Sequence, residues 1–133
     1  MGELDNLLRL IERFFGENAR VVILFGSRAR GEAREDSDYD VLIVVKYRTD
    51  EPLFWRELFR LEMEEETPYD VLIVSEDELT ADNPILWSVL TGYTVLKGES
   101  EWKAILDSPR GKIKSKKPVF VEEGKVWNVA QLV

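Results

Sequence analysis

Three aspartates occupy positions where their carboxylates could act together. Asp38 and Asp40 stand one residue apart at the start of an apolar run, and side chains alternate along a strand, so both point to one face. The letters Tyr-Asp-Val-Leu-Ile-Val occur at residues 39–44 and again at residues 69–74, where Asp70 takes the place of Asp40. In parallel neighbouring strands of equal register, the two backbones would lie about 4.8 Å apart. The sequence therefore predicts three carboxylates at one corner of a sheet.

Such a cluster suits a divalent cation. Carboxylates held together without a counter-ion repel one another and raise each other's pKa. Hard oxygen ligands at a water-accessible corner suit Mg²⁺, which keeps several waters and bridges to phosphate oxygens. Two ions about 3.5–4 Å apart can clamp the attacking and leaving oxygens of a phosphoryl displacement. We expect Asp38, Asp40 and Asp70 to bind Mg²⁺ as two ions, with Asp40 bridging them.

A glycine–serine pair ahead of the aspartates could hold phosphate groups. Gly26 follows an apolar run and lets backbone approach a ligand closely, while amides at a helix start point toward anions. Nearby arginines, Arg34 among them, could neutralise phosphate charge. We expect phosphate contacts from four residues: Gly26, Ser27, Arg28 and Arg30. The alternative for the arginines is a solvated loop with weak ion pairs to its acidic neighbours.

The elements that position these residues follow from hydrophobic periodicity. Helices are predicted at residues 4–15, 52–65 and 84–90, and strands at residues 20–25, 39–45, 69–74 and 93–96. The strand–helix–strand order around the repeat predicts a right-handed parallel crossover. A helical turn or two is expected at residues 101–106, then a basic loop at residues 111–117 and a hairpin turning at Glu123-Gly124. We expect a domain over residues 1–110 and a basic linker with a hairpin tail over residues 111–133.

Composition narrows the function classes. The 133 residues suit one domain and carry a formal net charge of −8, which argues against general nucleic-acid or anionic-membrane binding. Without Cys or His, chemistry must come from carboxylates, Lys, Arg, hydroxyl groups or a metal. The acidic start and the lack of long apolar runs predict neither a signal peptide nor a membrane span. We expect a cytoplasmic protein.

Gly26-Ser27, the ten residues that follow, and Asp38-x-Asp40 together resemble the GS-x10-DxD signature of the nucleotidyltransferase superfamily related to DNA polymerase β. Asp70 resembles the third carboxylate of that superfamily. In length and layout the chain is similar to minimal nucleotidyltransferases, a group often encoded beside HEPN-domain proteins in toxin–antitoxin systems. The motif is specific for the superfamily and much less so for the subgroup.

This resemblance implies an α/β (α+β) fold, with a small mixed sheet of the polymerase β palm type flanked by helices. It implies that Asp38 and Asp40 bind metal, and that Asp70 completes the site and helps to deprotonate the attacking hydroxyl. It further implies transfer of AMP from ATP to a tyrosine of a HEPN-domain toxin, so that the chain acts as an antitoxin by AMPylation. The chain has no room for a second domain, so the acceptor would come from the partner.

Two alternatives stay open. The chain could neutralise its partner by contact alone, with an inactive or merely nucleotide-binding site. It could instead transfer a nucleotide to a small molecule, although the missing second domain disfavours this. Trp127 in the hairpin is a candidate partner contact, because a two-stranded hairpin is marginal with nothing to pack against.

Overall fold

A four-stranded mixed sheet forms the centre of the computed structural model, which describes residues 2–133. Its order is β3-β2-β1-β4, with bounds β1 (Ala19–Phe25), β2 (Tyr39–Val45), β3 (Tyr69–Ser75) and β4 (Tyr93–Lys97). β1 runs antiparallel to β2 and to β4, whereas β2 and β3 are parallel. The predicted mixed sheet and its parallel crossover are confirmed.

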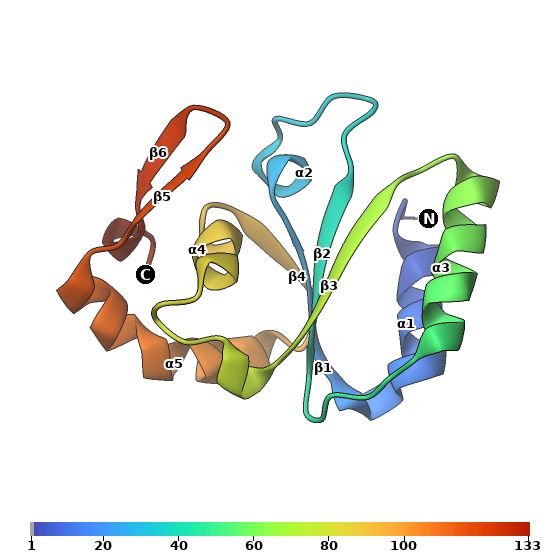
Figure 1. Ribbon diagram of the computed structural model, residues 1–133, viewed down its shortest axis with the longest axis horizontal. Helices are drawn as coiled ribbons and strands as arrows, with labels where there is room; N and C mark the ends of the chain where they lie inside the picture. The colour runs from blue at the N-terminus through green and yellow to red at the C-terminus, as the bar shows by residue number, and fades with distance from the viewer. Residues whose placement is uncertain (1) are drawn as a thin grey trace.

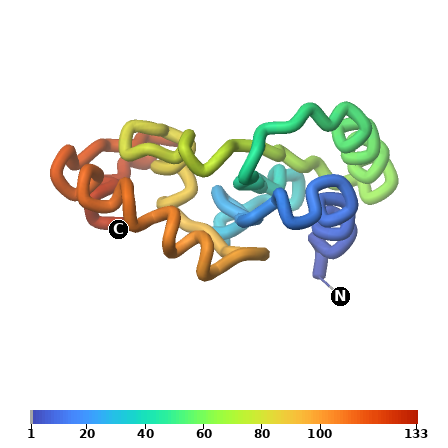
Figure 2. The backbone as a smooth tube through the Cα atoms, turned by 90° about the horizontal axis from the view of Figure 1, so that it is seen from below, coloured from blue at the N-terminus to red at the C-terminus, as the bar shows by residue number. Residues whose placement is uncertain are grey.

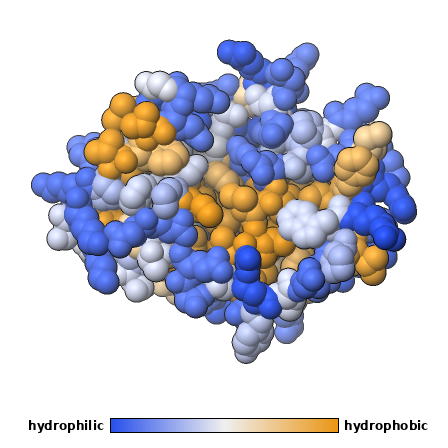
Figure 3. All heavy atoms as spheres, in the orientation of Figure 1, coloured by the Kyte–Doolittle hydropathy of each residue, from blue (hydrophilic) through white to orange (hydrophobic). Residues whose placement is uncertain are grey.

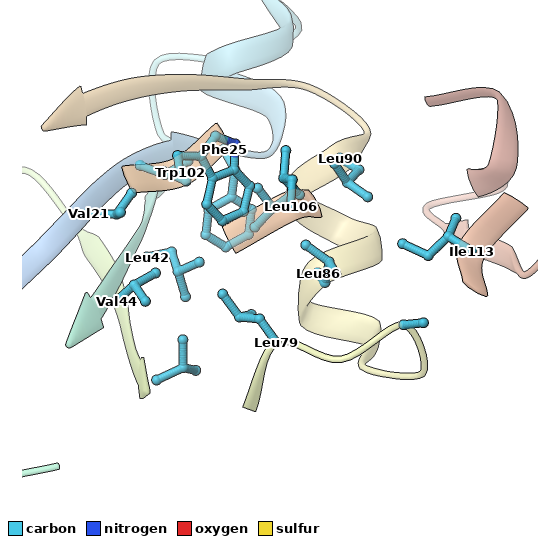
Figure 4. Packing of buried hydrophobic residues seen from close by; sticks show 14 of the residues in the cluster. Val21, Phe25, Leu42, Val44, Leu79, Leu86, Leu90, Trp102, Leu106 and Ile113 are labelled. Atoms are coloured by element: carbon cyan, nitrogen blue, oxygen red, sulfur yellow. The ribbon is translucent and has the colours of Figure 1, made fainter. Parts of the chain in front are cut away.

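Helices cover both faces of the sheet (Figures 1 and 2). On one face α1 (Asp5–Phe15) packs against α3 (Pro52–Glu65), with the Phe15 and Phe54 rings 5.0 Å apart edge to face. On the other face lie α4 (Pro84–Leu90) and α5 (Glu99–Lys116). Figure 4 shows Trp102 of α5 and Leu86 of α4 meeting the side chains of the sheet. Short turns of 3-10 helix complete the chain at three places: Gly16–Asn18, Glu76–Glu78 and Val129–Leu132.

Helix α5 corrects the expected loop at residues 111–117. The helix continues from Glu99 to Lys116, through Pro109 and Gly111, rather than ending after a turn or two. Its buried residues lie three or four positions apart and face the core: Trp102, Leu106, Pro109 and Ile113. Burial of this stripe outweighs the poor helix propensity of one proline and one glycine. The division of the chain near residue 110 stays a prediction, but the junction is helical.

The C-terminal hairpin forms where it was expected. β5 (Val119–Glu122) pairs antiparallel with β6 (Lys125–Asn128), and the turn residues Glu123 and Gly124 have φ of 49° and 77°. Two positive φ angles are typical of the type I′ turn, whose twist matches that of the strands. Figure 1 shows the hairpin standing beside α2 (Ser27–Arg30) and α4. Within residues 2–133, every helix is too short or too polar to span a bilayer.

Candidate active site

The repeated hexapeptide brings two aspartates together as the sequence predicts. β2 and β3 pair in equal register, so that Asp40 lies opposite Asp70. Asp40 also faces Phe25, the last residue of β1, and is half-buried, whereas Asp38 and Asp70 are exposed. The carboxylate corner, defined here as Asp38, Asp40 and Asp70, therefore sits where the parallel strands β2 and β3 begin.

The corner disfavours negative charge on its middle member. Burial, followed by the charges of Asp70 and Asp38, raises the pKa of Asp40 from its usual 3.8 to about 6. A hydrogen bond with Asp70 acts in the same direction. A divalent cation would relieve this repulsion, which makes the donor set chemically suited to Mg²⁺.

The carboxylates do not form a complete ion cage by themselves. Among residues 2–133, no group of three or more acidic side chains is arranged so that it could hold a metal ion. Mg²⁺ is often bound by only one or two carboxylates, with waters and substrate phosphates filling the other positions. The corner therefore fits an ion that arrives with a phosphate ligand better than a permanently held one.

Gly26 allows the backbone to pass against this corner. Its φ is +74°, and a Cβ built at this position would lie 2.3 Å from Oδ2 of Asp40. Only glycine tolerates both conditions. The carbonyl of Gly26 accepts hydrogen bonds from the amides of Ala29 and Arg30 and so starts helix α2. The glycine–serine pair thus begins a helical turn directly beside Asp40.

A cavity of about 810 Å³ opens in front of Asp38 and Asp40. Its size is within the range of small-molecule sites. Its walls come from α2, the loop that follows α2, the start of β2, and the C-terminal hairpin. The lining residues are Ser27, Glu32, Arg34, Asp36, Ser37, Asp38, Asp40, Glu122, Glu123 and Lys125. Asp70 lies beside Asp40 but does not line this cavity.

Arg28 is not among the residues that line the cavity. Its guanidinium group donates hydrogen bonds to the carbonyl oxygens of Ser37, at 2.9 Å, and Glu35, at 3.2 Å. The same group lies 4.3 Å from the centre of the Tyr39 ring. Arg28 therefore holds the loop that leads to the aspartates, and phosphate binding by Arg28 stays a prediction.

Arg30 connects α2 to the hairpin. Its side chain is 12% exposed and pairs with Glu32 at 2.8 Å, while Nη1 donates to Oγ1 of Thr91 at 2.8 Å. The guanidinium carbon lies 5.2 Å from the centre of the Trp127 ring. Nη2 of Arg30 lies 3.9 Å from Oε2 of Glu122. Because protein groups already surround it, Arg30 has a positioning role here. Its predicted phosphate contact also stays a prediction.

The sequence analysis missed the contribution of the hairpin to this site. Glu122, Glu123 and Lys125 line the cavity although they follow Asp40 by more than eighty residues. The available signal was the alternation of Phe120 and Trp127 with exposed residues, which marks one hairpin face for burial. That signal does not tell where the buried face docks.

Comparisons with known proteins agree with the motif. Residues 4–133 match the family model of the nucleotidyltransferase domain. The chain is 33% identical, over a 138-residue alignment, to MJ1305 of Methanocaldococcus jannaschii, which is assigned as a protein adenylyltransferase. That alignment covers 98% of this chain and 94% of the relative.

Solved structures share the architecture. A crystal structure of a toxin–antitoxin with AMP-PNP matches with a TM-score of 0.64 and 17% identity, covering 87% of this chain and 90% of that one. A crystal structure of the toxin–antitoxin MntA-HepT matches with a TM-score of 0.55 and 16% identity, covering 85% and 86% of the two chains. At these identities the likeness shows the fold.

Proposed function

The chain belongs to the nucleotidyltransferase domain family, and from that premise we propose that it transfers AMP from Mg²⁺-bound ATP to a tyrosine hydroxyl of a partner toxin. The observation that carries the proposal is the register of β2 and β3, which sets Asp40 against Asp70 beside the Gly26-Ser27 turn. The partner would be a HEPN-domain protein, and the modification would silence it, which makes this chain an antitoxin.

Each residue of the site has a distinct part in the proposed reaction. Asp38 and Asp40 would hold Mg²⁺, which when bound neutralises phosphate charge as the leaving group departs. Ser27, at the start of α2, lines the cavity where the phosphates would lie. Asp70, exposed beside Asp40, would accept the proton of the attacking hydroxyl. The oxygen–phosphorus bond forms at the α-phosphate, the α–β bond breaks, and pyrophosphate leaves.

A protein acceptor is supported by the relatives and by one surface. The full-length relative is assigned as a protein adenylyltransferase, and the structural neighbours are toxin–antitoxin complexes, one with a nucleotide analogue. Beside the cavity, the outer face of the hairpin exposes Val119, Val121 and Val126, and Figure 3 shows hydrophobic atoms gathered over the hairpin. An exposed apolar surface next to a polar cavity suits a protein acceptor better than a small polar molecule.

A contact-only antitoxin is the second candidate. The observation that favours it is the lack, within residues 2–133, of acidic groups already arranged to hold a metal ion. In that case the carboxylate corner would be a binding site or a relic. Loss of the aspartates would then leave neutralisation of the partner intact.

One measurement separates these two candidates. The protein encoded by the neighbouring gene is co-expressed with the wild-type chain, with the Asp38→Asn/Asp40→Asn double variant, or with Asp36→Asn. Asp36 is an exposed carboxylate that lines the same cavity, so it provides a matched control. The intact mass of the partner is then determined.

The proposed reaction requires a gain of whole AMP units with the wild type and Asp36→Asn chains, and none with the double variant. A complex that forms without any mass gain would reject the enzymatic function and favour the contact-only antitoxin.

A further inference from the structure

The active-site cavity has a strong excess of negative charge. Six of its lining residues are carboxylates: Glu32, Asp36, Asp38, Asp40, Glu122 and Glu123. Only Arg34 and Lys125 bring positive charge to the same walls. A nucleoside triphosphate carries several negative charges, so the site needs cations of its own in addition to any metal ion.

Other basic groups near the cavity are occupied by protein partners. The guanidinium groups of Arg28 and Arg30 are held by carbonyl oxygens, a hydroxyl, carboxylates and aromatic rings, as described above. Arg34 was already a candidate on sequence grounds, and its side chain makes neither an ion pair nor a hydrogen bond within residues 2–133. Lys125 is the second cationic side chain at the cavity, and the folding of the hairpin brings it there.

The hairpin holds Lys125 at the cavity. Lys125 pairs across the strands with Glu122, which also lines the cavity. Trp127, two residues further along β6, lies against Arg30 of α2, whose side chain is 12% exposed. Because Arg30 contacts Trp127 and Glu122, it holds the hairpin against α2 and keeps Lys125, the first residue of β6, at the cavity.

The present partner of Lys125 is an exchangeable one. Nζ of Lys125 forms an ion pair with Glu32, in which the two side chains are 54% and 37% exposed. Exposed ion pairs contribute little stability. A phosphate group with two negative charges can therefore compete with the single carboxylate of Glu32 for Lys125. The lysine can therefore change partners without disturbing the packed side chains of the hairpin.

We propose that Lys125 binds the β- and γ-phosphates of the donor nucleotide, and that the C-terminal hairpin is thereby part of the nucleotide site. This inference rests on the proposed nucleotidyl transfer. The ligand class is a nucleoside triphosphate, and a monophosphate, which has neither of these phosphates, should gain nothing from the lysine.

The chain offers a closely matched control for Lys125. Lys116 at the end of α5 is 55% exposed and pairs with Asp82, outside the residues that line the cavity. Dissociation constants for Mg²⁺-ATP and Mg²⁺-AMP are measured by calorimetry on the wild type, K125A and K116A. We expect K125A to weaken ATP binding roughly tenfold, the scale of one lost charge-assisted hydrogen bond. AMP binding by K125A, and both affinities of K116A, should match the wild type.

A second variant separates phosphate binding from a purely structural role. E32Q removes the charge that now pairs with Lys125 and keeps the shape of the side chain. If Lys125 binds phosphate, E32Q should bind ATP at least as tightly as the wild type, because the lysine no longer has a competing partner. If the lysine only fastens the hairpin to Glu32, E32Q and K125A should weaken ATP and AMP alike, which would overturn the inference.

Failure of the inference can be told from failure of the proposed function. Wild-type protein that binds ATP, together with K125A that binds it equally well, would reject the role of Lys125 and leave nucleotidyl transfer standing. Wild-type protein that binds no nucleoside triphosphate in the presence of Mg²⁺ would reject both.

Discussion

Asp40 carries its charge where the fold disfavours it. Burial and the neighbouring Asp70 and Asp38 raise its pKa to about 6, above its value in an unfolded chain. The folded state then binds this proton more tightly, so the contribution of Asp40 to stability is fully present below pH 4 and is lost as the pH rises through 6. At neutral pH the metal-free protein retains this repulsion.

The variant Asp40→Asn should therefore be more stable than the wild type under metal-free conditions. With a chelator at pH 7.5, its thermal midpoint is expected to lie above that of the wild type, and the difference should shrink at pH 4. Nucleotidyl transfer should be lost in the same variant, because a carboxylate proposed to hold Mg²⁺ is gone. Calorimetry at the two pH values checks this, with Asp36→Asn as control. A lower midpoint for Asp40→Asn at pH 7.5 would contradict the electrostatic explanation.

Gly26 and Gly31 form a natural pair for testing the close contact at the aspartates. Both have φ of +74°, but an added Cβ would clash with Asp40 at Gly26 and would meet nothing within 4 Å at Gly31. Gly31 has a ψ of 22° and is left-handed, which costs alanine about 1–2 kcal/mol, whereas the ψ of −155° at Gly26 belongs to a region that essentially only glycine adopts and so adds to the cost of the clash. Gly26→Ala should lose more stability than Gly31→Ala in urea denaturation and should also lose transfer, whereas Gly31→Ala should keep transfer. Equal effects of the two substitutions would show that the Asp40 contact is unimportant.

At the scale of elements, local sequence patterns were sufficient to predict the position and pairing of β2 and β3. The identical hexapeptides and the helix predicted between them indicated parallel strands in equal register, and β2 and β3 pair in that way. Helical turns were predicted at residues 101–106, but the C-terminal part of α5 was predicted as a loop because it contains Gly111 and several lysines. The burial of Ile113, which favours the helix, depends on a core assembled from distant segments.

Gly111 provides a direct check on this helix. It lies inside α5, is exposed, and has free space around the position of a Cβ. Alanine there should increase the free energy of unfolding by about 0.5–1 kcal/mol, because glycine loses more backbone entropy in a helix. Chemical denaturation measures the change, and nucleotide affinity should stay constant. No gain in stability would indicate that residues 111–117 behave as the loop that the sequence suggested.

At the scale of the whole molecule, the site is assembled from parts that no local pattern connects. Arg28 and Arg30 were expected at the phosphates because they follow Ser27 closely. Successive residues of a helical turn point about 100° apart, so they cannot all face one cavity. The hairpin, by contrast, reaches the site through contacts with Arg30, Glu32 and α4. Motif spacing therefore predicted the carboxylate corner, and tertiary packing decided which basic side chains join it.

The negative charge of the cavity predicts that binding of the nucleotide depends on Mg²⁺. With six carboxylates lining the walls, ATP without a metal ion would place further negative charge against them. Mg²⁺-ATP should therefore raise the thermal midpoint of the wild type, by an amount that corresponds to about 2.7 kcal/mol at a concentration one hundred times the dissociation constant. ATP with a chelator should give little of this shift, and the Asp38→Asn/Asp40→Asn variant should lose the metal dependence. An equal shift with and without Mg²⁺ would mean that the nucleotide is bound away from the carboxylate corner.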